Sequence, residues 1–184
     1  MTRPATIRSE RLLLRPACGE DLSALLTLWR EPEVRRYLFD GDVPTREQAA
    51  RYLSGQRSVW LLQRLAGPEL LGCVTLRETP GGAREPGVAL HPQHQGRGFA
   101  QEALSALLAH AAEALGAKPL VASCCVPDAA GQRLLHRLGF VAGYECDGGR
   151  YRVRQYRKER PLHSPPASPC VRSAALPSCR LAVA

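Results

Sequence analysis

A loop with two glycines, between a short apolar run and a long amphipathic segment, restricts the fold of this chain more than any other feature. Gly87 to Leu90 is typical of a strand, and the loop from Pro92 leads into a helical pattern that extends from Gly98 to Leu115. Leu120 to Val126 follows as an apolar run, as expected for a buried strand. This order predicts a β-α-β unit whose first and last strands are parallel.

Weaker patterns on both sides of this unit predict further elements. Thr45 and Gln48 have the spacing of a capping box, which predicts a helix extending to about Leu53. Ala66 to Glu69 indicates a hairpin turn, so the strands on its two sides should be antiparallel. The other expected elements are strands at 11–16, 58–64, 70–77, 140–144 and 150–156, and helices from about 20 and over 129–138. The predicted fold class is therefore α+β, an α/β mixture in one domain.

The length of 184 residues fits one domain with one hydrophobic core, which we expect to cover residues 1–160. Residues 161–184 are rich in Pro, Ser and Ala and have no periodic apolar face, which predicts a disordered tail. No apolar run approaches the roughly 20 residues that span a bilayer, and the polar, basic N-terminus is unlike a secretory signal. We therefore expect a cytoplasmic protein that does not enter a membrane.

Cysteine content and charge narrow the chemistry further. The seven cysteines include no Cys-x-x-Cys pair, so we expect reduced thiols and no metal site. The net charge is +8, and a basic stretch from Arg150 to Arg160 is interleaved with Tyr151 and Tyr156, a pattern compatible with nucleic-acid binding. We interpret it instead as a solvated strand face whose alternate residues, Tyr151, Val153 and Gln155, pack inward. No specific nucleic-acid partner is expected.

The glycine loop has the parts of a pyrophosphate site. Gly96 and Gly98 allow the backbone to approach phosphates without a Cβ atom in the way, and Arg97 adds a positive charge. The helix that follows offers unpaired N–H groups and roughly half a positive charge at its N-terminus. The Gly-x-x-x-x-Gly-Lys-Ser/Thr motif and the third glycine of the dinucleotide fingerprint are both absent from the sequence, which excludes these two classes. We interpret His91 and His94, which flank the loop, as exposed residues without a catalytic role.

Several motifs together resemble the GNAT superfamily of acetyltransferases. Gln93-x-x-Gly96-x-Gly98, preceded by Leu90-His91-Pro92 and followed by Ala100-x-Glu102-Ala103, is similar to the acetyl-CoA-binding motif of that superfamily. The segments 7–16, 32–38 and 128–140 resemble the Rim-type subfamily, which acetylates the N-termini of ribosomal proteins. The resemblance covers the chain from about residue 5 to residue 158.

This resemblance implies a GNAT-like splayed, mixed and largely antiparallel sheet flanked by helices, with acetyl-CoA as co-substrate. The pantetheine would lie between the strand ending at Leu90 and the strand beginning near Leu120. An amine would attack the thioester directly, with Glu85 as the general base. The residues that would bind the cofactor, through backbone or side-chain groups, are Val88, Ala89, Leu90, Gln93, Gln95, Gly96, Arg97, Gly98, Phe99, Ala100, Asp128 and Arg133.

Some positions depart from the pattern of the family. Pro86, next to the expected base, removes an N–H group and suggests a bulge or an edge position. Asp128 and Gly131 replace the usual asparagine and serine, and Leu135 stands where many GNAT enzymes have a tyrosine that acts as general acid. We therefore expect the leaving thiolate to be protonated by another group or to leave unaided.

The expected reaction is acetylation of a primary amine. An α-amino group with a pKa of about 7.8 is roughly 30% neutral at pH 7.4, whereas a lysine with a pKa of about 10.4 is only about 0.1% neutral. We therefore expect a protein N-terminus as the acceptor. An aminoglycoside or another small amine is the alternative enzyme substrate, and a non-catalytic acyl-CoA-binding or basic ribosome-associated module is the alternative of another class. A homodimer is compatible with this sequence, as is a monomer.

Overall fold

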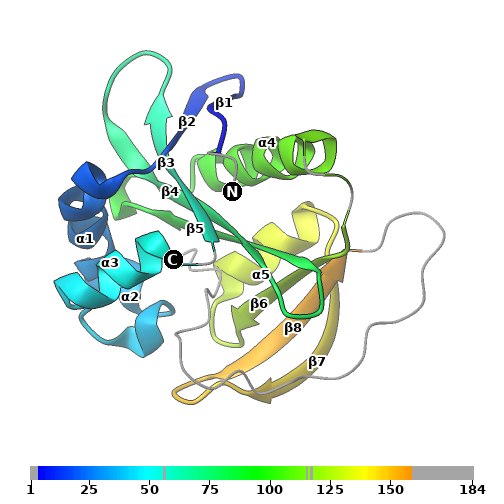
Figure 1. Cartoon of the computed structure of the whole chain (residues 1–184). Coiled ribbons are helices and arrows are strands. Elements are labelled where there is room, and N and C mark those ends of the chain that lie inside the picture. The colour runs from blue at the N-terminus through cyan, green and yellow to red at the C-terminus, as the bar shows by residue number, and fades with distance from the viewer. Residues whose placement is uncertain (1–3, 56, 115, 117, 159–184) are drawn as a thin grey trace.

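The computed structural model describes residues 4–55, 57–114, 116 and 118–158 (Figure 1). These residues form one eight-stranded sheet in the order β1-β2-β3-β4-β5-β6-β8-β7. The strands are β1 (Ile7–Arg8), β2 (Leu12–Pro16), β3 (Arg57–Arg64), β4 (Leu70–Glu78), β5 (Arg84–Leu90), β6 (Leu120–Cys125), β7 (Val141–Asp147) and β8 (Arg152–Lys158). The helices are α1 (Leu22–Arg30), α2 (Pro32–Arg35), α3 (Arg46–Ser54), α4 (Phe99–Ala114) and α5 (Ala129–Arg137). The expected tail, 161–184, lies outside the described residues.

The α+β fold class predicted from the sequence is confirmed. Every neighbouring pair of described strands is antiparallel except β5 and β6, which are parallel and joined through α4 as the β-α-β pattern requires. β3 and β4 form the hairpin expected around 66–69. The capping box of α3 is also present, because Gln48 N donates to Thr45 Oγ1 at 3.2 Å and Thr45 N donates to Gln48 Oε1 at 2.8 Å.

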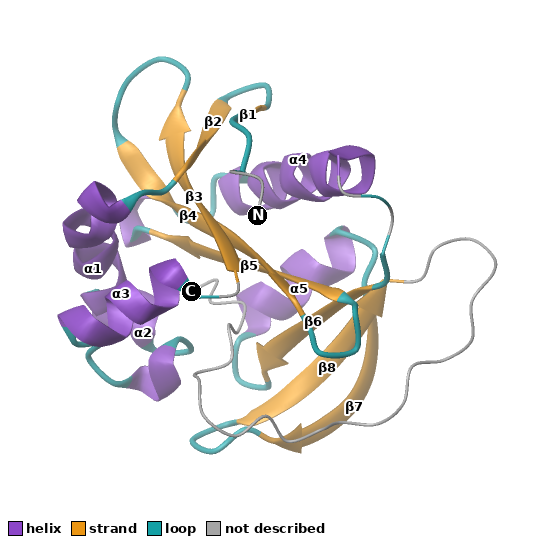
Figure 2. Cartoon of the chain, viewed as in Figure 1, coloured by secondary structure: helices purple, strands orange, loops and turns teal. Residues whose placement is uncertain are grey.

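Helices cover both faces of the sheet (Figure 2). α4 and α5 pack over a core that includes Trp60, Leu104 and Leu135. α1, α2 and α3 pack over a second core, in which the rings of Trp29 and Phe39 meet edge to face with centroids 5.6 Å apart. The sequence predicted one core, and the sheet divides it into two. No helix in the described part of the chain is long and apolar enough to cross a membrane.

β5 and β6 run parallel but separate almost at once. In the described structure their ladder consists of one residue pair, Arg84 opposite Leu120, and Arg84 N donates to Pro119 O at 2.8 Å. Amide groups along a strand point to alternate sides, so the next amide on the β6 side is that of Pro86, which has no N–H group. The parallel ladder therefore ends there, and the two strands diverge toward their carboxyl ends.

Pro86 lies in an interior strand, which corrects the expectation of a bulge or an edge position. Leu76 of β4 is opposite Pro86, and the register between β4 and β5 continues without a shift on both sides. A proline is tolerated here because its nitrogen faces the opening between β5 and β6, where no ladder hydrogen bond is lost.

Two further expectations need correction. The short strand β1 was not predicted, since its two residues, paired with Leu13 and Leu14, are too few to show a period. Tyr156 is 2% exposed and packs edge to face against His136 of α5, so the arginine-bearing face of β8 is partly buried under that helix rather than solvated. Val153, on the other face, is buried as expected.

Candidate functional site

The glycine loop has a backbone that favours glycine. Gly96 and Gly98 have φ angles of 71° and 79°, in the left-handed region, and direct the chain from the 3-10 turn Pro92–His94 into α4. The N–H of Glu102 donates to Gly98 O at 3.1 Å and closes the first helical turn. Earlier N–H groups of α4 have no partner within the helix. The exposed loop glycines therefore leave these donors open to an anion.

The gap between β5 and β6 leads to this loop. After Pro86, Val88 is the next residue whose peptide groups face the gap, whereas those of Ala89 face Cys73 of β4. The side chain of Gln95 donates from Nε2 to Leu90 O at 3.1 Å, which holds the loop against the end of β5. Among the residues that the structure describes, the edge of β5 at Val88 has no strand partner on the β6 side, and the first N–H groups of α4 have no partner within the helix. These two sets of backbone groups follow one another along the chain.

A pocket of about 310 Å³ lies between the loop, α2 and the start of α5. The fold brings Gln95 and Asp128 together in this pocket. Tyr37 lines the pocket, and two contacts hold its side chain in place. Its hydroxyl donates to Pro127 O at 3.3 Å, and its ring contacts that of Tyr151, with centroids 5.6 Å apart. Burial raises the pKa of the Tyr37 hydroxyl. The lining residues are Glu33, Arg36, Tyr37, Gln95, Pro127, Asp128, Ala129 and Ala130.

Glu85 lies in a polar row that crosses the sheet where β5 and β6 separate. Its Oε1 accepts a hydrogen bond from Ser123 Oγ of β6 at 2.9 Å, and its Oε2 accepts one from Arg77 of β4. Ser123 Oγ also lies 3.1 Å from Oε1 of Gln155 on β8. Glu85 is 2% exposed, whereas Ser123 is partly exposed. The hydroxyl of Ser123 is therefore the more accessible end of this pair.

Asp128 forms a packed unit with two neighbours. Its Oδ1 accepts the N–H of Gly131 at 2.8 Å and so caps α5, while its Oδ2 lies 3.8 Å from Cys124 Sγ. Burial, and then the charge of Asp128, raise the pKa of the Cys124 thiol. A Cβ atom on Gly131 would stand 2.5 Å from Asp128 Oδ2 and 2.9 Å from Cys124 Sγ. Asp128 and Gly131, the two residues that replace the usual asparagine and serine, are therefore linked by packing.

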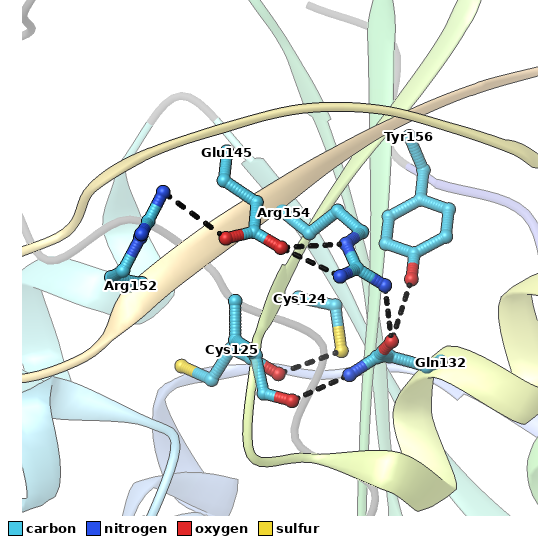
Figure 3. A network of polar contacts seen from close by, with 8 residues as sticks. Cys124, Cys125, Gln132, Glu145, Arg152, Arg154 and Tyr156 are labelled. Carbon is cyan, nitrogen blue, oxygen red and sulfur yellow. Dashed lines mark hydrogen bonds and ion pairs between the residues drawn. The ribbon is translucent and has the colours of Figure 1, made fainter.

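A polar network attaches α5 to the last two strands (Figure 3). Gln132 donates to Val126 O at 2.6 Å, and its Oε1 accepts from Arg154 at 2.9 Å and from Tyr156 at 3.2 Å. Arg154 Nη2 lies 2.6 Å from Glu145 Oε1, and its hydrogen bond lowers the pKa of the Glu145 carboxyl. This network fixes the start of α5, which forms one wall of the pocket.

Other positions singled out in the sequence lie elsewhere. Leu135 is fully buried in the core under α5, so its position is not open to a substrate. Arg133 is exposed on α5 and does not line the pocket. His94 is 4% exposed, which corrects the expectation of an exposed loop histidine. Its Nε2 lies 3.3 Å from Glu69 Oε1, and burial lowers its pKa.

Sequence reasoning missed three residues that contact the predicted site. Arg77 and Ser123 meet Glu85 only through strand register, although a serine within the apolar run of β6 was an available signal. Arg11, in the turn between β1 and β2, contacts the glycine loop through the carbonyl of Arg97. This contact joins segments that are far apart in the sequence.

Comparisons with known proteins agree with this geometry. YoaA, an uncharacterized N-acetyltransferase of Bacillus subtilis (strain 168), is 28% identical over 144 residues, which are 73% of this chain and 81% of YoaA. RimL, a ribosomal-protein α-N-acetyltransferase solved in complex with coenzyme A, shares the fold with a TM-score of 0.71 and 21% identity, over 84% of this chain and 97% of that one. A variant of the spermidine N-acetyltransferase SpeG from Vibrio cholerae has a TM-score of 0.66 and 17% identity, over 81% and 94% of the two chains.

The acetyltransferase (GNAT) domain family matches residues 11–141, which include the glycine loop, Glu85 and the start of α5. This match extends over more than half of the chain, and it ends within β7. The chain therefore belongs to the GNAT family of acetyltransferases.

Proposed function

We propose that this enzyme transfers the acetyl group of acetyl-CoA to the α-amino group of a protein N-terminus in the cytoplasm. The observation that carries the proposal is the one-pair ladder between β5 and β6, which opens a gap directly beside the glycine loop. GNAT acetyltransferases use acetyl-CoA as co-substrate, and RimL, which has the same fold, was solved with coenzyme A.

The residues around the loop and gap fit the two parts of this co-substrate. The backbone N–H groups from Gly96 to Ala100 would hold the pyrophosphate, whereas that of Gln95 already donates to Pro92 O at 3.2 Å. No heavy atom lies within 4 Å of a Cβ position on Gly96. The unpaired edge of Val88 offers an N–H and a C=O to the pantetheine. When bound, acetyl-CoA supplies a thioester whose carbonyl carbon accepts a nucleophile. The side chains of Arg97 and Arg133 are exposed cations that would meet phosphate groups.

We place the acceptor at the Glu33 side of the pocket described above, and the charges there favour an acceptor with one amine over a polyamine. Its lining contains two carboxylates, those of Glu33 and Asp128, and one guanidinium, that of Arg36. Asp128 already caps α5 through Gly131, so Glu33 remains as the carboxylate nearest to solvent. One ammonium group of a peptide N-terminus matches this arrangement, whereas a spermidine or an aminoglycoside carries several positive charges.

Glu85 is proposed to receive the proton of the acceptor ammonium by way of Ser123. The Ser123 hydroxyl gives its proton to Oε1 of Glu85 and takes one from the ammonium, which leaves a neutral amine for attack. Arg77 holds the carboxylate in place. Because the position of Leu135 offers no acid, the proton that the nitrogen releases as the N–C bond forms goes to the thiolate sulfur as the C–S bond breaks.

Release of free thiol from acetyl-CoA, measured with the full chain and a panel of acceptors, tests this proposal. Peptides with a free α-amine are expected to be acetylated, and the same peptides with a blocked N-terminus should give no thiol. Turnover of spermidine or an aminoglycoside without turnover of any peptide would overturn the α-amine assignment. Mass spectrometry of a peptide with both an N-terminus and a lysine would place the acetyl group.

A further inference from the structure

An arginine from a distant part of the chain holds the phosphate-binding loop. Nη1 of Arg11, in the turn between β1 and β2, donates to the carbonyl oxygen of Arg97 at 3.3 Å. The guanidinium carbon lies 4.6 Å from the centre of the Phe99 ring. Nη2 lies 3.5 Å from the position that a Cβ atom would occupy on Gly98. Arg11 therefore contacts the consecutive residues 97 to 99 that lead into α4.

Glu102, in the first turn of α4, fixes Arg11 in this position. Its Oε2 accepts from Arg11 Nε at 2.6 Å, and its Oε1 accepts from Arg11 N at 2.8 Å and from Ser9 Oγ at 2.7 Å. Burial opposes ionisation of Glu102, but these hydrogen bonds outweigh it and lower the pKa of the carboxyl. The turn is thus attached to α4 by three hydrogen bonds to one carboxylate.

Two physical consequences follow for an anion at the loop. A loop with two glycines in the left-handed region has much conformational freedom to lose, and a contact that orders it beforehand reduces the entropy cost of binding. In addition, the carboxylate of Glu102 lies in the helical turn that the pyrophosphate would approach, where it would repel a phosphate. The guanidinium of Arg11 neutralises that charge.

We infer that Arg11 is a positioning residue for acetyl-CoA, which preorganises the loop 96–98 and offsets the charge of Glu102. This inference rests on the proposed function. Among the contacts of the described residues, none joins Arg11 or Glu102 to Glu85 or Ser123. The loss of Arg11 should therefore weaken binding of acetyl-CoA and leave the chemical step unchanged.

Calorimetric titration of acetyl-CoA into the full chain tests the inference. Arg11→Ala should raise Kd about tenfold, equivalent to the loss of one charge-assisted hydrogen bond. It should raise KM for acetyl-CoA while kcat stays within about twofold of the wild-type value. Arg8→Ala is the matched control, because Arg8 is an exposed arginine on β1, next to the turn that carries Arg11. The Arg8→Ala variant should keep the wild-type Kd. Arg11→Ala/Glu102→Gln should bind at least as well as Arg11→Ala, since the repelling carboxylate is gone.

A wild-type Kd for Arg11→Ala would overturn the inference, as would an equal loss of affinity in Arg8→Ala, which would indicate an effect of net charge alone. Thermal unfolding of the ligand-free variants separates loss of fold from loss of binding. Arg11→Lys keeps the positive charge but has fewer N–H donors, so its Kd for acetyl-CoA should lie between those of the wild type and Arg11→Ala. A wild-type chain that bound no acetyl-CoA would refute the proposed function itself, whereas normal binding by both the wild type and Arg11→Ala would refute only the role of Arg11.

Discussion

Ser123 on β6 and Glu85 on β5 form a hydrogen bond of 2.9 Å close to the residue pair at which the ladder joins these two strands. A side-chain contact thus continues the link between β5 and β6 where their backbone ladder ends at Pro86. The same contact connects a carboxylate that is 2% exposed to a hydroxyl that is partly exposed. The separation of the strands and the predicted base are therefore parts of one local arrangement.

Glu85→Gln should lower kcat for a peptide acceptor on the order of 100-fold at pH 7, and Ser123→Ala about tenfold, because each removes one group of the proposed proton transfer. KM for acetyl-CoA should change little. The defect should shrink near pH 9, where most of an α-amine with a pKa of about 7.8 is already neutral. The measurement is a pH profile of kcat, with Ser54→Ala on α3 as the control. Wild-type kcat in Glu85→Gln at pH 7 would mean that Glu85 is only the ion-pair partner of Arg77.

Gly131→Ser, which restores the residue usual in the family, should destabilise this chain by about 2 kcal/mol, because the new Cβ atom would stand 2.5 Å from Asp128 Oδ2. The destabilisation should be smaller when Asp128→Ala is combined with it, since the clashing carboxylate is then absent. Urea unfolding of the two single variants and the double variant measures this coupling. Gly67→Ser is the control, because no heavy atom lies within 4 Å of its Cβ position. Additive effects in the double variant would contradict the packing argument.

Elements with local causes were predictable from the sequence. Thr45 and Gln48 cap α3 within a single turn, and Gly98 begins α4 by its own backbone preference. Contacts that depend on the register of distant strands were not predictable. Ser123 and Glu85 meet because β5 and β6 pair at one particular residue, and Arg11 meets Glu102 because β1 and β2 lie beside α4. The family motif indicated the loop, but it gave no information about these supports.

The sequence also did not predict how deeply some residues of the motifs are buried. Leu135 was expected to stand where many family members have a general acid, but its complete burial could not be inferred from the helical period alone. His94 was misjudged for a similar reason, since loop residues are usually exposed and the approach of Glu69 from the β3–β4 hairpin is a tertiary contact.

The stability of the fold should fall as the pH drops below about 6.5, in part because of His94. Burial lowers the pKa of this histidine in the folded chain, so the unfolded chain takes up a proton first as the pH decreases. Its stabilising contribution is therefore present above the unfolded pKa and is lost as the pH falls through the folded pKa. Urea unfolding from pH 8 to pH 5 should show a weaker pH dependence in His94→Gln than in the wild type. His136→Gln, at an exposed position, should behave like the wild type, and equal slopes in all three would contradict this role.

Gly96→Glu separates binding at the loop from the stability of the fold. Gly96 has a φ angle of 71° and Gly82 one of 76°, and no heavy atom lies within 4 Å of either Cβ position. Glutamate at each site should therefore cause similar backbone strain, about 1 kcal/mol, and add the same charge. In Gly96→Glu, however, the carboxylate would lie beside the N–H groups that we propose hold the pyrophosphate, and Kd for acetyl-CoA should rise on the order of 100-fold. Gly82→Glu should bind like the wild type in calorimetric titration. Similar affinities in the two variants would mean that the pyrophosphate does not bind at this loop.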